Sequence, residues 1–180
     1  MSSTDKTVLA SAGFHGDVLT LVKRIGVRMQ NYEYQHRKPM STPACAQMLA
    51  TMLYGKRFFP YYTYNILAGL DADGKGCVFS YDPVGSYERE HYRAAGTASA
   101  LLQPFLDNQA RALARIPDYI GRKNQQGVVF EPISKERAMT IIKDVFTSAA
   151  ERDIYTGDAV DIRIVTKDGL EEHRFPLRCD

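Results

Sequence analysis

The loop Glu151–Asp158, with the sequence ERDIYTGD, is the stretch whose residue types could do chemistry. Asp153 and Thr156 place a carboxylate and a hydroxyl three residues apart. Polar groups of this kind orient and activate a nucleophile in covalent catalysis. A dense polar turn between two buried elements also holds its side chains in a fixed geometry. The loop is therefore the first candidate for an active centre.

The elements on both sides of this loop follow from hydrophobic periodicity. Ser134 is a good N-cap residue ahead of an apolar run. The apolar residues of that run recur at spacings of three and four: Ala138, Ile141, Ile142, Val145, Phe146 and Ala149. After the loop, Val160, Ile162 and Ile164 alternate with Asp161 and Arg163. The pattern predicts a helix that runs into the loop and a strand that leaves it.

Three further groups of residues could supply a nucleophile or a base, and we favour a structural role for each. Ser2 would become an N-terminal nucleophile if Met1 were removed, but no partner lysine is identifiable. His15 is expected to lie in a turn that starts a helix. Cys45 could pair with His36 or His91 as a thiol and a base. Its place on the apolar side of a predicted helix indicates a small buried hydrophobic residue instead.

Two other stretches could bind a ligand. Asp71-Ala72-Asp73-Gly74 resembles the start of a calcium loop, but the glutamate that would complete it is absent and a hairpin explains the Asp-Gly pair. An aromatic run could form a ligand surface, and it consists of Phe58, Phe59, Tyr61, Tyr62 and Tyr64. Its alternating spacing favours a strand that contributes to the core and to a subunit interface.

Composition narrows the classes of function. The chain has 180 residues, a net charge of +2 and no block of basic residues, which argues against nucleic-acid binding. No apolar run approaches the length of a membrane span. Cys45, Cys77 and Cys179 are scattered, so we expect reduced thiols and no zinc site. We expect no metal and no cofactor.

The remaining pattern predicts an α+β fold with antiparallel sheets, in the order β, α, α, β, β, β, α, α, β, β. The expected strands are Thr7–Phe14, Phe58–Asp71, Gly76–Asp82, Glu88–Ala95, Val160–Thr166 and Leu170–Leu177. The expected helices are Val18–Tyr32, Thr42–Tyr54, one that opens at Gly96–Ser99 and passes Leu106, and the helix after Ser134. Residues 108–131 lack a pattern and are expected to be a surface insertion that contacts partners. The whole chain, 1–180, is expected to form one domain.

Four motifs give the chain a family resemblance. SAGFHGD at Ser11–Asp17, RFFPYYTYNILAGLD at Arg57–Asp71, GKGCVFSYDPVGSY at Gly74–Tyr87 and KDVFTSAAERDIYTGD at Lys143–Asp158 resemble a proteasome β subunit. The resemblance is to a β-ring member that is not a peptidase. It implies the four-layer αββα sandwich of the N-terminal nucleophile hydrolases. It also implies a seven-membered β ring within the 28-subunit 20S core, with other α and β subunits as partners.

The same resemblance implies how the chain departs from its family. Active members begin with further strands that carry an N-terminal threonine, an aspartate and a lysine. These have no match here, so an N-terminally truncated form and no catalytic residues are expected. Thr97, Asp153 and Thr156 would be structural counterparts of the family's active-site loops.

Three functions follow as hypotheses. The first is a non-catalytic structural subunit that supports ATP- and ubiquitin-dependent protein degradation in the cytoplasm and nucleus, without nucleic acid or membrane. The second is a threonine- or serine-type peptidase with its own N-terminal nucleophile. The third is a truncated form that cannot assemble.

Overall fold

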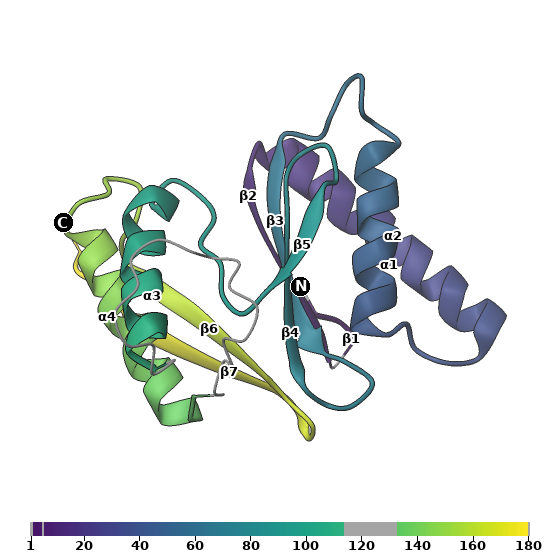
Figure 1. Cartoon of the computed structure of the whole chain (residues 1–180). Helices are drawn as coiled ribbons and strands as arrows, with labels where there is room; N and C mark the ends of the chain where they lie inside the picture. The colour runs from purple at the N-terminus through teal and green to yellow at the C-terminus, as the bar shows by residue number, and fades with distance from the viewer. Residues whose placement is uncertain (1, 5, 114–132, 180) are drawn as a thin grey trace. The chain divides into compact units, whose positions relative to one another are not determined.

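The computed structural model describes residues 2–4, 6–113 and 133–179, which fall into two compact units (Figure 1). The first unit holds Met1–Gly96 and Asp161–Arg174, and the second holds Thr97–Val160 and Phe175–Asp180. The structure is α+β, as predicted. That 1–180 forms one domain stays a prediction.

The order of elements matches the predicted one except for an additional short strand at the start. In chain order, the elements are β1 Ser2–Thr4, β2 Thr7–Gly13, α1 His15–His36, α2 Thr42–Tyr54, β3 Thr63–Leu70, β4 Gly76–Tyr81, β5 Tyr87–Glu90, α3 Ser99–Leu113, α4 Lys135–Ala150, β6 Ala159–Thr166 and β7 Gly169–Pro176. α3 covers the first part of the predicted insertion 108–131, and residues 114–132 lie outside the described residues.

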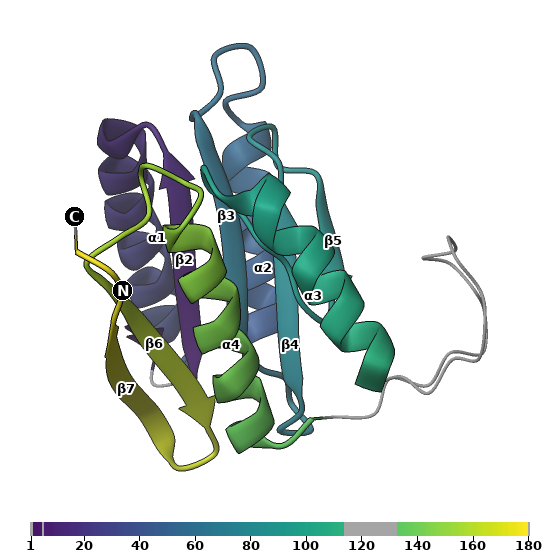
Figure 2. The same cartoon turned by 90° about the vertical axis from the view of Figure 1, so that its left-hand side faces the viewer.

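The first unit contains a five-stranded antiparallel sheet in the order β1-β2-β3-β4-β5. α1 contacts β2, and α2 contacts β3 and β4, so both helices cover the same face of the sheet (Figure 1 and Figure 2). β6 and β7 pair as a separate two-stranded hairpin. In that hairpin, the Thr166 hydroxyl donates to the main-chain oxygen of Gly169 at 3.0 Å.

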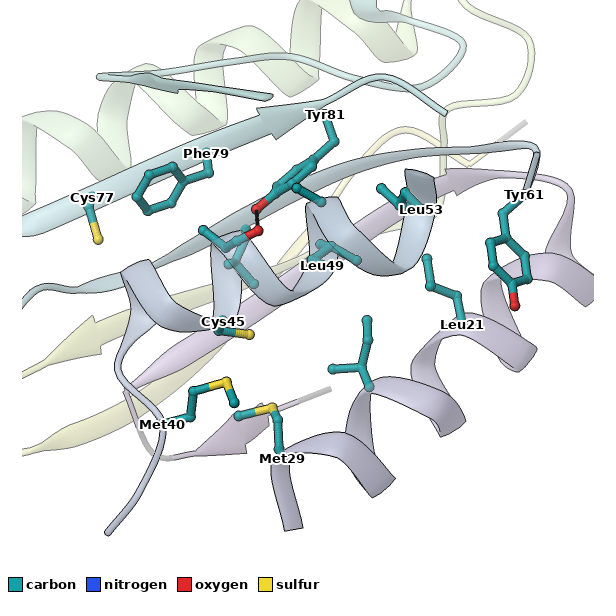
Figure 3. Close-up of a cluster of buried hydrophobic side chains, with 14 residues drawn as sticks. Leu21, Met29, Met40, Cys45, Leu49, Leu53, Tyr61, Cys77, Phe79 and Tyr81 are labelled. Atoms are coloured by element: carbon teal, nitrogen blue, oxygen red, sulfur yellow. Dashed lines mark hydrogen bonds between the residues drawn. The ribbon is translucent and has the colours of Figure 1, made fainter. Parts of the chain in front are cut away.

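The hydrophobic core of the first unit lies between the helices and the sheet (Figure 3). Its fully buried leucines are Leu21 of α1, Leu49 and Leu53 of α2, and Leu67 of β3. Alternation along β3 and β4 sends every second side chain into this layer. Burial of one leucine contributes about 1.5–3 kcal/mol, so this layer is the main source of stability for the unit.

Two buried hydrogen bonds fix α2 against the sheet. The Tyr81 hydroxyl donates to the main-chain oxygen of Ala46 at 2.8 Å (Figure 3). Burial raises the pKa of the Tyr81 phenol, which keeps its proton for this bond. At the start of α2, the hydroxyls of Thr7 and Thr42 are 2.8 Å apart and bonded to each other.

The prediction of a strand from Phe58 onward is wrong for Phe58–Tyr62. β3 begins only at Thr63. The preceding residues form turns, in which Arg57 N–H donates to Tyr54 O and Phe59 N–H donates to Lys56 O, both at 3.0 Å. Pro60 has no N–H to give to a strand ladder. The predicted strand Glu88–Ala95 is also too long, because β5 ends at Glu90.

The close approach of α2 to β3 yields a stability prediction. A Cβ at Gly69 would lie 2.4 Å from the main-chain oxygen of Lys6 and 2.5 Å from Oγ1 of Thr42. We expect Gly69→Ala to lower the free energy of unfolding by about 1–3 kcal/mol through overpacking. Chemical denaturation of the full chain, followed by circular dichroism, measures this.

Gly26→Ala is the matched control, because a Cβ at Gly26 in α1 would meet nothing within 4 Å. We expect this change to raise the free energy of unfolding by about 0.5–1 kcal/mol, the helical preference of alanine over glycine. Equal effects of the two substitutions would show that the contact at Gly69 is not tight.

Candidate functional site

Thr97, Asp153 and Thr156 form a hydrogen-bonded cluster in the second unit. The hydroxyls of Thr97 and Thr156 both donate to Oδ2 of Asp153, each at 2.7 Å. The main-chain N–H of Tyr155 donates to the other carboxylate oxygen at 3.3 Å. The structure therefore brings together all three predicted residues, although Thr97 is 56 positions away from Asp153 in the chain.

The positions of these side chains depend on two helices that contact each other. Thr97 lies just before α3, and Asp153 follows α4. α4 starts as predicted, with the Ser134 hydroxyl accepting from Arg137 N–H at 3.2 Å. At its end, the N–H groups of Arg152 and Asp153 both donate to Ala149 O. Asp153 therefore closes the helix through its main chain and not through its carboxylate.

The loop is also tied to the C-terminal segment of the same unit. Leu177 N–H donates to Asp158 O at 2.8 Å. Arg178 forms a salt bridge with Glu151, with Nη1 and Oε2 2.9 Å apart. Between these ties, Ile154 and Tyr155 are exposed. Both ends of the loop are thus held, so Asp153 keeps its position relative to α3 and α4.

The hydrogen bonds of the cluster determine the electrostatics of Asp153. Donation by Thr156, then by Thr97 and the Tyr155 amide, holds the pKa of the Asp153 carboxyl below its usual range, against a smaller opposing effect of desolvation. Hydrogen bonds to the charged form favour ionisation. An aspartate with a lowered pKa is a weak general base at neutral pH. The cluster is therefore suited to holding a loop and poorly suited to proton abstraction.

Of the two other candidate nucleophiles, Ser2 is the first residue of β1 and Cys45 is inside the core. Burial raises the pKa of its thiol to about 11, whereas a nucleophilic cysteine needs a lowered pKa. The preferred interpretation of Cys45 as a small buried residue is confirmed. His15 is the first residue of α1, as expected for a histidine that begins a helix.

The carboxylate of Asp71 is occupied by the hairpin that it closes. Its Oδ1 accepts from the N–H groups of Asp73 and Lys75, and its Oδ2 forms a salt bridge with Arg89 at 3.1 Å.

Within the described ranges, no three histidine, cysteine, aspartate or glutamate side chains come close enough to hold a metal ion. None of the helices in the described part of the chain is long and apolar enough to span a membrane.

Sequence reasoning missed two parts of this site. The Tyr155 amide contributes a main-chain donor, which no side-chain pattern reveals. The salt bridge between Glu151 and Arg178 joins residues 27 positions apart, and each is one of many charged residues in the sequence. Only the three-residue spacing of Asp153 and Thr156 was visible as a local signal.

Comparisons with known proteins show extensive similarity. The family model described as "Proteasome subunit" matches residues 1–120. Proteasome subunit beta type-1-B of Carassius auratus is 54% identical over 177 residues, which cover 98% of this chain and 70% of that protein. Proteasome subunit beta type-1 of Oryza sativa subsp. japonica is 50% identical over 176 residues, covering 98% and 77%. The probable proteasome subunit beta type-6 of Schizosaccharomyces pombe is 46% identical over 177 residues, with the same coverage.

The lowered pKa of Asp153 predicts a pH-dependent contribution to stability. A carboxylate whose pKa is lower in the folded state stabilises the fold above its unfolded pKa, and this contribution is lost as the pH falls through the folded value. We expect Asp153→Asn to destabilise the chain at pH 7. The difference from wild type should shrink below about pH 4, where unfolded aspartates begin to take up protons. Thermal unfolding across this pH range measures it.

Asp158→Asn is the control for the loss of one charge from the same loop. The Asp158 side chain accepts no hydrogen bond among the described residues, and asparagine tolerates its φ of 61°.

Thr156→Val should raise the pKa of the Asp153 carboxyl, because it removes a hydroxyl that donates to the carboxylate, and a carboxyl NMR titration measures this. An unchanged pKa would contradict the assignment of the shift to this hydroxyl.

Proposed function

The chain belongs to the proteasome subunit family, and from this premise we propose that it is a non-catalytic structural subunit of the β ring of the 20S core. Its role is to form part of the wall of the chamber in which neighbouring subunits cleave peptides. Proteins named proteasome subunit beta type-1 in a fish and a plant, at 54% and 50% identity, support the assignment to a β ring.

The hydrogen bonds within the Asp153 cluster are the observation that supports a non-catalytic role. Oδ2 of Asp153 already accepts from two threonine hydroxyls, and within the described residues neither hydroxyl is hydrogen-bonded to a stronger base. Among the described residues, no lysine or arginine forms a salt bridge with Asp153. A peptidase centre needs an activated nucleophile beside a base of matched pKa. The cluster instead holds the loop in place through its hydrogen bonds.

The four-layer αββα sandwich is the architecture that we propose for the assembled subunit. In the first unit, α1 and α2 cover one face of the five-stranded sheet. By the strand register, the opposite face carries mainly small and branched apolar side chains: Val8, Ala10, Ile66, Ala68 and Val78. An apolar second face is what packing against another sheet requires. The N-terminal nucleophile hydrolase fold of the family supplies that second sheet.

The partners in this proposal are other α and β subunits of the 28-subunit core. The chain would act in the cytoplasm and nucleus and support ATP- and ubiquitin-dependent degradation through assembly. No cofactor is required for a role of this kind. The predicted partner contact by residues 108–131 remains part of the proposal.

Incorporation into the core particle tests the proposed role. The epitope-tagged full chain, expressed in eukaryotic cells, should sediment with the other core subunits and retain them through affinity purification. A covalent probe for N-terminal nucleophiles should label the catalytic subunits of the purified particle and leave the tagged chain unlabelled. The physical reason is that the hydrogen bonds to Asp153 lower the pKa of its carboxyl, which makes it a weak base at neutral pH.

Labelling of the tagged chain by the probe would favour the peptidase hypothesis. Sedimentation of the chain only as free protein would favour a form that cannot assemble. A chain carrying Asp153→Asn, which keeps the side-chain size but removes its charge, serves as the control for any labelling that depends on the cluster.

A further inference from the structure

The connection between α2 and β3 carries two adjacent phenylalanines that are exposed to solvent. Phe58 is 95% exposed and Phe59 is 84% exposed. They lie in the segment Lys56–Tyr62, the Phe58 loop, which is at the top of Figure 1. A single exposed apolar residue needs no explanation, whereas exposed apolar surface that is contiguous is typical of an interaction site.

The main chain of the Phe58 loop is held by hydrogen bonds at both ends. Lys56 N–H donates to Leu53 O, and Phe59 N–H donates to Lys56 O, both at 3.0 Å. At the other end, Tyr62 N–H donates to Oδ2 of Asp17 in α1 at 2.9 Å. A partner would therefore meet a loop that is already ordered, which lowers the entropic cost of binding.

The side chain of Tyr61 fixes the same loop to the core. Tyr61 is 6% exposed and belongs to the buried cluster that contains Leu21 (Figure 3). The ring of Pro60, which precedes it, restricts the main chain further. One aromatic side chain of the loop is thus buried, while Phe58 and Phe59 are outside. Their exposure follows from a fixed conformation of the loop and not from a frayed end.

The charge around the two phenylalanines is positive. Residues 34–70 contain no aspartate or glutamate, and their lysines and arginines are Arg37, Lys38, Lys56 and Arg57. The guanidinium carbon of Arg57 is 5.5 Å from the centre of the Phe58 ring. In the part of the chain that the structure describes, neither Lys56 nor Arg57 forms a salt bridge. A surface complementary to this loop therefore has to combine apolar and acidic groups.

We propose that the Phe58 loop inserts into an apolar pocket with an acidic rim on a neighbouring proteasome subunit. The rings of Phe58 and Phe59 fill the pocket, and the carboxylates of the rim face Lys56 and Arg57. Aromatic residues and arginine are enriched in protein interfaces, where a few buried anchors supply most of the binding energy. This inference rests on the proposed function, because it gives the chemistry of one contact through which the chain assembles.

Competition between tagged chains during assembly tests the Phe58 loop. Wild-type and variant chains with different tags are expressed together in eukaryotic cells, and their ratio in the purified core particle is measured. We expect the double variant Phe58→Ala, Phe59→Ala to reduce incorporation by about ten-fold or more, the effect of truncating an interface anchor. The double variant Val27→Ala, Tyr34→Ala is the matched control, because both side chains are exposed on α1, and it should compete equally with wild type.

A second pair of variants tests the acidic rim. Arg57→Glu places a carboxylate against the carboxylates of the partner, so incorporation should fall by about ten-fold or more. Lys38→Glu makes the same change of charge outside the loop, at an exposed residue, and should stay within about two-fold of wild type. Equal effects of the two substitutions would show that the net charge of the chain matters and the loop does not, which would overturn the proposal.

Thermal unfolding of the free chain separates binding from folding. Because Phe58 and Phe59 are almost fully exposed, alanine at both positions should leave the melting temperature unchanged. An unchanged melting temperature together with poor incorporation supports the interface. A lower melting temperature together with poor incorporation would show a folding defect and overturn it.

A photocrosslinker identifies the partner. Phe58→p-benzoylphenylalanine in the assembled particle should crosslink to another subunit, in a peptide that contains apolar residues together with aspartate or glutamate. A particle that contains the chain but gives no crosslink, or variants that all compete equally with wild type, would overturn the interface and leave the proposed function standing. Failure of the wild-type chain to enter the particle would overturn both.

Anionic vesicles test a membrane as the other surface that suits exposed phenylalanines beside basic residues. The free chain should not sediment with vesicles of phosphatidylserine and phosphatidylcholine. Sedimentation that is lost in the double variant Phe58→Ala, Phe59→Ala, with no crosslink in the particle, would assign the loop to a lipid surface and overturn the protein interface.

Discussion

The packing of α2 against β3 and β4 is the contact on which the first unit depends. Leu49 and Leu53 of α2 and Leu67 of β3 belong to one buried cluster, and the Tyr81 hydroxyl ties α2 to the sheet by donating to Ala46 O at 2.8 Å. Gly69 allows the approach, since a Cβ there would meet Lys6 and Thr42 within 2.5 Å. The Lys56–Tyr62 loop follows the end of α2, so the position of this helix also determines where the loop lies.

In the second unit, one carboxylate performs a comparable role. Asp153 accepts hydrogen bonds from groups that precede α3 and follow α4, and these bonds join two segments that are distant in the chain. The bonds that fix its position also lower its pKa, and a lower pKa weakens it as a base. Structural function and catalytic function therefore oppose each other at this residue. This opposition is the physical basis for proposing a subunit that shapes the ring and leaves proteolysis to its neighbours.

Local patterns predicted the elements well where one signal dominated. The predicted helix Thr42–Tyr54 has the bounds of α2, and the three- and four-residue spacing predicted α4 from Ser134 onward. The prediction of a strand over Phe58–Tyr62 is wrong because it followed the aromatic composition, which favours a strand. Pro60 and the main-chain turns prevent one. The meeting of Thr97 with Asp153 could not be derived from spacing, since it depends on how two helices pack. It was anticipated only through the family resemblance.

Native mass spectrometry of the purified core particle tests the central claim most directly. If the chain is a β-ring subunit, intact particles should contain it at two copies, one in each β ring, and the chain should be released on dissociation. The mass of the released chain should be unchanged after treatment of the particle with a covalent inhibitor of N-terminal nucleophiles. Particles that lack the chain, or a released chain that carries the inhibitor, would contradict the account.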